Sequence, residues 1–243
     1  MFREVQTTAF QGVGFSVAAI RLVHAQADAC RVMTEKGEES AATPGAYLLI
    51  TLSDAFLVDP ARAEAAPVEA TGLKPVGGQP ADVDIDLREV SLVEASAVDG
   101  ERVLGQRTRR RVYDLRYTEV RAAAPGAAVQ HEERHEIWGV PWRDDLTAWR
   151  QWRVAEDAGA GAASPELRDA LERIQADGLP LRHQIERRRR TGNGEWLPIE
   201  RVRRDITAYD PQEFEAGYFS LPADYRLTEF LAPTDEPGVT EDP

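Results

Sequence analysis

The sequence contains one cysteine, Cys30, among its 243 residues. A lone cysteine excludes an internal disulfide and any zinc site built from several thiolates. Cys30 lies in an alternating apolar segment, and a reactive thiol would need basic neighbours in space. We therefore expect a small buried hydrophobe with an unreactive thiol.

Long apolar runs are also missing. No stretch approaches the roughly 20 consecutive apolar residues that a membrane-spanning helix needs. The first ten residues, Met1–Phe10, contain no apolar signal-peptide core. We expect a soluble chain without a transmembrane segment, cytoplasmic unless a signal peptide was removed ahead of this N-terminus.

Positive charge is scarce and is carried almost wholly by arginine. Lys36 and Lys74 are the only lysines, and 29 basic residues against 42 acidic ones give a net charge of −13. Because phosphate and protein would repel each other, nucleic acid is not an expected partner. The arginine bias, together with many alanines and glycines, indicates a GC-rich bacterial genome.

Period-two alternation of apolar residues predicts strands through the first 140 residues. The predicted strands cover 2–10, 15–24, 25–35, 46–52, 55–58, 82–98, 101–106, 109–121 and 129–140. Turn signals separate several of them, notably Ser53-Asp54 and the hairpin dipeptide Asp99-Gly100. Four prolines between residues 59 and 81 predict an irregular connection.

Helical patterns come only later. Residues 144–154 place large apolar side chains at near-helical spacing, and Ser164-Pro165-Glu166 is an N-cap followed by proline at the first helical position. Gly178 is expected to end that second helix. A long hairpin follows from residue 181 to residue 208, turning at 192–194, and a final strand is predicted over 225–231.

These patterns predict a mainly β protein with one large, curved antiparallel sheet and one or two helices. A sheet with so many strands tends to curl, and helices can then cover its concave face. Residues 1–231 are expected to form one domain because no internal repeat or composition break divides them. The acidic, proline-rich residues 232–243 are expected to be disordered.

Five short motifs occur in an order that resembles a known fold family. They are Leu57-Val58-Asp59-Pro60, Leu104-Gly105-Gln106-Arg107-Thr108-Arg109, Glu136-Ile137-Trp138, Gly178-Leu179-Pro180-Leu181 and Phe219-Ser220-Leu221-Pro222-Ala223-Asp224-Tyr225. The chain resembles periplasmic domains of unknown function with the lipoprotein-carrier (LolA/LolB-like) half-barrel fold.

The resemblance covers roughly residues 45–230 and implies a half-open barrel whose helices close an apolar cavity. Carriers of this fold hold acyl chains and are exported, so it implies a periplasmic or cell-envelope location and a lipid, lipidated protein or other hydrophobe as partner. The motifs are structural, and they speak more to fold than to activity.

The sharpest chemical motif is His131-Glu132-Glu133-Arg134-His135, which matches the HExxH pattern of zinc peptidases. That chemistry requires a helix, so that both histidines lie on one face. Gly139 and Pro141 follow closely and favour a strand. We prefer a surface strand with His131, Glu133 and His135 on a solvated face, and retain a zinc hydrolase using His131, Glu132 and His135 as a minor alternative.

Arginines concentrate in two windows, seven among residues 101–121 and eight among residues 182–204. One interpretation is an anionic ligand met by guanidinium groups, with Arg109, Arg111, Arg187 and Arg189 as candidates. The alternative is cross-strand pairing with the glutamates of residues 132–136. Pairing is favoured, since charged runs on strands usually form solvated faces.

Four of the five tryptophans fall between residues 138 and 152. They suit the mouth of an apolar cavity or the core of a helix–sheet junction, and the sequence leaves both open. If a cavity exists, its lining is predicted to combine strand residues, this cluster and the second helix. The candidates are Leu48, Ile50, Ile137, Trp138, Trp142, Leu146, Trp149, Trp152, Leu167, Leu171 and Ile206.

Three functions remain open. The first and favoured one is a binding module, not an enzyme, that holds an apolar ligand and has no cofactor. The second is an enzyme using the same cavity, which arginines together with an inward-facing Glu133 or His135 would favour. The third is a structural or interaction protein of the envelope with a filled core. Ligand identity and oligomeric state are not fixed by the sequence.

Overall fold

The computed structural model describes residues 1–10, 15–36, 45–68, 85–121, 124–141, 146–159, 164–176, 178–192 and 194–229. Twelve strands of these residues form one sheet. In sheet order they are β12 (Arg226–Leu227), β6 (Glu64–Pro67), β5 (Ala55–Asp59), β4 (Tyr47–Thr51), β3 (Ala29–Lys36), β2 (Phe15–Gln26), β1 (Phe2–Phe10), β11 (Leu197–Tyr209), β10 (Leu179–Thr191), β9 (Ala124–Val140), β8 (Gln106–Arg121) and β7 (Ile85–Val103).

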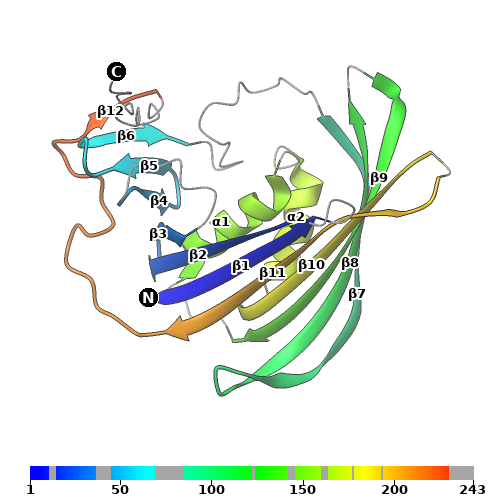
Figure 1. Ribbon diagram of the computed structural model, residues 1–243, viewed down its shortest axis with the longest axis horizontal. Coiled ribbons are helices and arrows are strands. Elements are labelled where there is room, and N and C mark those ends of the chain that lie inside the picture. Colours follow the sequence, from blue (N-terminus) through cyan, green and yellow to red (C-terminus); the bar gives the residue numbers. More distant parts are fainter. Residues whose placement is uncertain are drawn as a thin grey trace, which may run out of the picture.

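The sheet is open and strongly curved, and two helices lie inside the curve (Figure 1). All neighbouring strands run antiparallel except the edge pair β12–β6, which is parallel. Helix α1 (Thr147–Ala158) contacts β2, β3 and β4, whereas α2 (Pro165–Gln175) packs on α1 and on β7. The predicted mainly β class, with a curved sheet and helices over its concave face, is confirmed.

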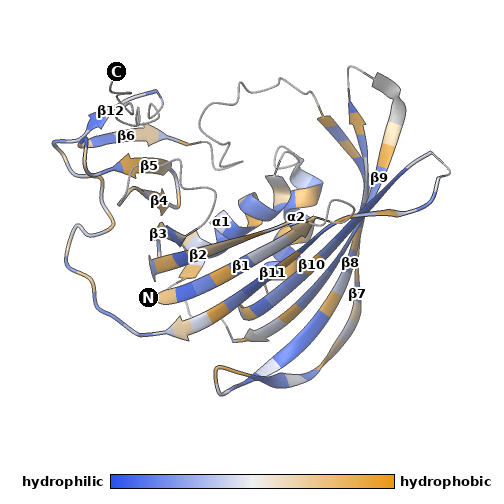
Figure 2. Cartoon of the chain, viewed as in Figure 1, coloured by the Kyte–Doolittle hydropathy of each residue, from blue (hydrophilic) through white to orange (hydrophobic). Residues whose placement is uncertain are grey.

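The first strand lies in the middle of the sheet. Phe2 is opposite Val23 of β2 on one side and Tyr209 of β11 on the other. The antiparallel meander β7–β11 and the N-terminal strands β1–β6 therefore join through the β1–β11 pair. Apolar and polar residues alternate along most strands, as expected for a sheet with two different faces (Figure 2).

One predicted turn is wrong. Asp99-Gly100 does not form a hairpin, because β7 continues through it as one strand to Val103. Pairing with β8 is irregular between Asp99 and Arg102, and the chain turns instead at Leu104-Gly105, both with positive φ. Gly100 serves a different purpose: a Cβ there would lie 2.4 Å from Oγ1 of Thr108.

The second helix begins as predicted, with the Ser164 hydroxyl accepting a hydrogen bond from the Leu167 amide. The first helix is displaced from its predicted span of 144–154 and extends to Ala158. Gly178 follows α2 at φ +144°, where a Cβ would lie 2.2 Å from the carbonyl oxygen of Val140. Only glycine fits this close approach of two backbone segments.

The segment after β11 covers the outer face of the N-terminal strands. Phe214, Tyr218 and Phe219 pack with Tyr47 and Leu49 in one apolar cluster. This segment ends in β12, which pairs with β6 and is shorter than the predicted strand over 225–231. Strand β6 itself lies in the region expected to be irregular, and the tail 232–243 is outside the described residues.

Candidate functional site

Most of the predicted cavity-lining residues gather on the concave face, between the sheet and the helices. Trp138 is the exception, because it alternates with Ile137 along β9 and has Arg110 and Arg182 over its ring on the other face of the sheet. Two apolar clusters contain the candidates: the first holds Leu48, Ile50, Trp138, Leu146, Trp149, Trp152 and Ile206, and the second holds Ile137, Leu167 and Leu171. Trp142 lies outside the described residues. All ten described candidates are buried.

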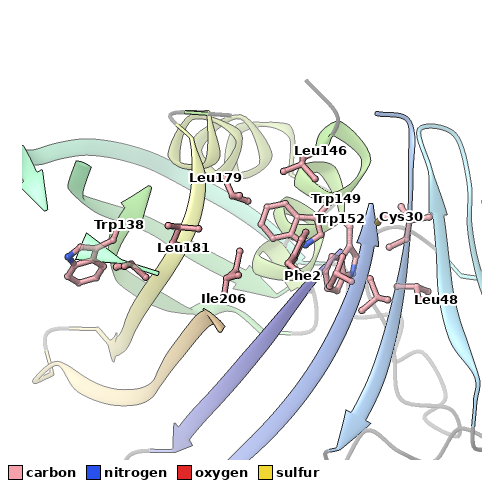
Figure 3. Packing of buried hydrophobic residues seen from close by; sticks show 14 residues of the cluster. Phe2, Cys30, Leu48, Trp138, Leu146, Trp149, Trp152, Leu179, Leu181 and Ile206 are labelled. Carbon is pink, nitrogen blue, oxygen red and sulfur yellow. The ribbon is translucent and has the colours of Figure 1, made fainter. Parts of the chain in front are cut away.

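In the first cluster, the α1 tryptophans fill the space above the strands (Figure 3). The Trp149 ring meets the ring of Phe2 edge-on, with centroids 5.1 Å apart. Cys30 lies in the same cluster and is fully buried, and burial raises the pKa of its thiol. The buried cysteine expected from the sequence is present, and the tryptophans at helical spacing are core residues in this structure.

A band of charged residues lies on the same concave face. Its members are four arginines and four carboxylates from β1, β2, β9, β10, β11 and α1, namely Arg21, Arg153, Arg187, Arg204, Glu4, Glu133, Glu156 and Asp157. We call this set the charged band. Of its members the sequence singled out only Arg187 and Glu133, because the set is scattered along almost the whole chain.

Glu156 is the centre of the charged band. Its carboxylate lies 2.6 Å from Arg21, 2.5 Å from Arg153 and 3.5 Å from Arg204. Burial alone would raise the pKa of Glu156, but these three guanidinium groups outweigh burial and bring the pKa to about 2. The side chain is therefore ionised, and it ties α1 to β2 and β11.

Asp157 makes the second link between α1 and the sheet. One carboxylate oxygen accepts a hydrogen bond from Arg204 at 2.5 Å, and the other accepts one from the Gln175 amide of α2. Arg187 of β10 donates to the backbone oxygen of Asp157 and to Glu200. These bonds fix the position of the last turn of α1 over the strands.

A chain of hydrogen bonds runs along β9 and β10 inside the molecule. His135 contacts Glu133 through Nε2 at 3.1 Å and His183 through Nδ1 at 3.1 Å. Burial would raise the pKa of Glu133, but Arg187 and His135 lower it to about 2, so the carboxylate accepts from His135. Nε2 of His183 completes the chain, and within the described part of the chain its buried Nδ1 has no hydrogen-bond partner.

The predicted solvated face of the HExxH segment is wrong. Glu133 and His135 are 4% and 0% exposed, because the alternate residues of β9 face the helices. Glu132 points to the opposite face of the sheet from His131 and His135, as alternation along a strand requires. No group of three or more His, Cys, Asp or Glu among the described residues is arranged to hold a metal ion.

The four arginines proposed to bind an anion are not brought together. Arg187 is part of the charged band, and Arg111 contacts Glu94 at 3.8 Å and the Tyr113 hydroxyl. Arg189 is opposite His131, whereas Arg111 and Arg109 are opposite Ile137 and Gly139. Six residues of strand separate Arg189 from Arg111, a distance of about 20 Å. Cross-strand pairs such as Arg110–Glu136, at 2.7 Å, match the alternative interpretation.

None of the helices in the described ranges is long and apolar enough to cross a membrane. Comparisons with family models, curated proteins and solved structures found no match. Function is therefore inferred from the curved sheet, the helix pair and the charged band between them.

Proposed function

We propose that the chain is a binding module that holds an apolar ligand, such as an acyl chain or lipid, between the sheet and the helix pair. The observation that carries the proposal is the layer formed by α1 and α2, inserted between β9 and β10 and laid across the concave face of an open sheet. The helix layer is not paired to either edge strand of the sheet. It can therefore move away from the concave face and act as a lid.

The apolar surface beneath the lid suits hydrocarbon. Leu48, Ile50 and Ile206 lie on strands of both halves of the sheet and converge on one cluster. Transfer of a hydrocarbon chain from water to such a surface contributes about 0.8 kcal/mol for each buried methylene. An acyl chain would occupy the space that Trp149 and Trp152 fill when the lid is closed.

The charged band supports a reversible lid. Burying an ion pair costs desolvation free energy that offsets much of the Coulomb attraction, and the charges regain hydration when the interface opens. An interface held partly by Glu156 and Asp157 therefore opens at a smaller cost than an apolar interface of equal area. The directional hydrogen bonds to Arg21 and Arg204 restore the same position on closing.

The experiment is a titration with palmitate, followed by native mass spectrometry and by tryptophan fluorescence. We expect one palmitate per chain. Ile50→Ala should weaken binding several-fold through lost apolar contact, whereas Leu52→Ala should not. Leu52 comes directly after β4, the strand that carries Ile50, but it is 54% exposed. Circular dichroism checks that both variants remain folded, and equal weakening by the two substitutions would contradict the proposal.

A structural or interaction protein with a filled core is the alternative, favoured by the complete burial of Trp149. It predicts no palmitate binding and no co-purifying hydrophobe on organic extraction. The enzyme hypothesis is supported by Glu133 and His135, which face inward beside Arg187. A substrate could reach His135 or His183 only after α1 moves, since both side chains are at most 1% exposed.

A further inference from the structure

A groove of about 640 Å³ lies on the side of the sheet away from the helices, over β8, β9, β10 and β11. A second groove of about 330 Å³ adjoins it, and both are lined by Arg116, Glu132, Arg188 and Trp196. Glu133 faces α1 and neighbouring Glu132 faces outward, so the groove lies on the opposite face of the sheet from the proposed lipid site. Arg187 of the charged band is the one member of that set that also lines the groove. The combined volume is within the range of small-molecule sites.

Two arginines in the groove share one carboxylate. Arg116 donates from Nε and Nη2 to Oε1 of Glu132, at 2.8 and 2.6 Å, and Arg188 contacts Oε2. The Glu132 side chain is only 6% exposed, whereas those of Arg116 and Arg188 are 64% and 53% exposed. The carboxylate is buried beneath two guanidinium groups that keep further N–H donors for an incoming group.

The other arginines of the larger groove have carboxylates of their own. Arg134 lies 3.2 Å from Asp114, Arg201 lies 2.5 Å from Glu186, and Arg187 lies 2.6 Å from Glu200. In the larger groove the excess positive charge is therefore localised at Arg116 and Arg188, and Arg190, which contacts the neutral Gln130 amide, adds to it from the smaller groove. The groove is therefore locally positive, although the chain as a whole has a net charge of −13.

Trp196 forms an aromatic wall beside this charge. The guanidinium carbons of Arg188 and Arg190 lie 5.4 and 4.8 Å from the centre of its ring. Stacking of two cations on one indole holds both the ring and the Arg188 head group in place. A planar group on the ligand would find an ordered aromatic surface next to the anion site.

We propose that this groove binds a phosphate monoester, with the phosphate at Arg116 and Arg188 and an attached planar or apolar group against Trp196. A compact dianion fits because both guanidinium groups converge on one point, the Glu132 carboxylate. An extended acidic peptide would instead require a row of uncompensated cations. The phosphate could belong to a free small molecule or to a lipid head group at a membrane surface.

The test uses phenyl phosphate and isothermal titration calorimetry at low ionic strength. Arg188→Gln should weaken binding about tenfold or more, because a charged fork to the phosphate is lost. Glu132→Gln should strengthen binding several-fold, because it removes the one negative charge beneath the two arginines. An ion pair with a purely structural role predicts no gain of affinity from Glu132→Gln.

Arg3→Gln is the matched control. Arg3 is 45% exposed and paired with Glu35 at 2.9 Å, but it lies on β1 opposite Ala208, seven residues along β11 from Arg201. Its substitution changes the net charge as Arg188→Gln does, and it should leave the affinity unchanged.

Vesicles of phosphatidic acid in phosphatidylcholine, with phosphatidylcholine alone as reference, separate the two sources of phosphate. Binding of phenyl phosphate with opposite effects of Arg188→Gln and Glu132→Gln assigns a small-molecule site. The same pair of effects on phosphatidic acid vesicles alone assigns a head-group site. Binding to neither probe, or equal weakening by Arg188→Gln and Arg3→Gln, overturns the proposal.

Discussion

At the scale of single residues, substitution of Glu156 is expected to lower the free energy of unfolding markedly. Glu156→Gln keeps the shape of the side chain but leaves Arg21 and Arg153 buried, each 2% exposed or less, with less compensating charge. Breaking one partner of a buried ion-pair network costs about 3–5 kcal/mol of unfolding free energy. Urea unfolding measures the loss. Glu35→Gln, at an exposed pair with Arg3, should change it by less than about 1 kcal/mol.

The charged band and the hydrogen bonds that link Glu133, His135 and His183 also make the stability of the fold depend on pH. Glu133 and Glu156 have a pKa of about 2 in the folded protein against a usual 4.5. As pH falls through 4.5 the unfolded chain binds protons first, so the stabilisation from these carboxylates is complete above that pH and is lost towards pH 2. Burial likewise holds the pKa of His183 well below 6.5.

Because His183 stays neutral when folded and charges when unfolded, its effect begins at higher pH. We expect the urea midpoint to fall from about pH 6.5 downward, with a second, steeper loss below about pH 4.5. His183→Gln should reduce the change between pH 7 and pH 5.5, because glutamine can still form a hydrogen bond with His135 but does not titrate. An unchanged slope in that variant would show that other groups govern the loss.

At the scale of elements, the junction between β9 and β10 depends on Gly178. An alanine there would place Cβ 2.2 Å from the Val140 carbonyl oxygen at a φ that L residues rarely adopt. We expect Gly178→Ala to destabilise the protein by about 2–4 kcal/mol, from strain and displaced backbone.

Gly217→Ala is the control for the backbone contribution alone. Gly217 has φ +85°, yet a Cβ at this position would meet no other atom within 4 Å. Its substitution should cost about 1 kcal/mol. Thermal unfolding of both variants separates steric overlap from conformational preference, and equal losses would contradict the role given to the Val140 contact.

Most strands could be predicted because alternation records which residues share a face. Alternation does not record which face points inward when that face is charged, and this is why His131, Glu133 and His135 were expected in solvent. The charged band itself needs Glu4, Glu156 and Arg204 to meet in space, which no local pattern reveals. Asp99-Gly100 misled because an irregular stretch within a strand uses the same residues as a turn.

At the scale of the whole molecule, the accessibility of the Cys30 thiol can be used to detect movement of the helix pair. It is the only cysteine, and it is buried in the cluster beneath α1. If the helices lift as a unit, a thiol reagent should label Cys30 through an opening that costs less free energy than global unfolding. Labelling rates in low urea, compared with the urea unfolding curve, give the two free energies.

Glu156→Gln should speed this labelling, since it weakens the attachment of α1 to β2 and β11. Cys30→Ala supplies the unlabelled background for the mass measurement. A labelling free energy equal to that of global unfolding would mean that the helices leave the sheet only when the protein unfolds, and the lid proposed for ligand entry would then have no support.

The central position of β1 has a consequence for how the chain reaches this structure. Phe2 pairs with Tyr209, so the seam between the two halves of the sheet joins residues more than 200 positions apart. Contacts of such long sequence separation form slowly. During synthesis, β1 has no β11 partner until residues 197–209 have emerged. An exposed strand edge of this kind pairs readily with other chains, so the nascent protein is most vulnerable to aggregation just before β11 is made.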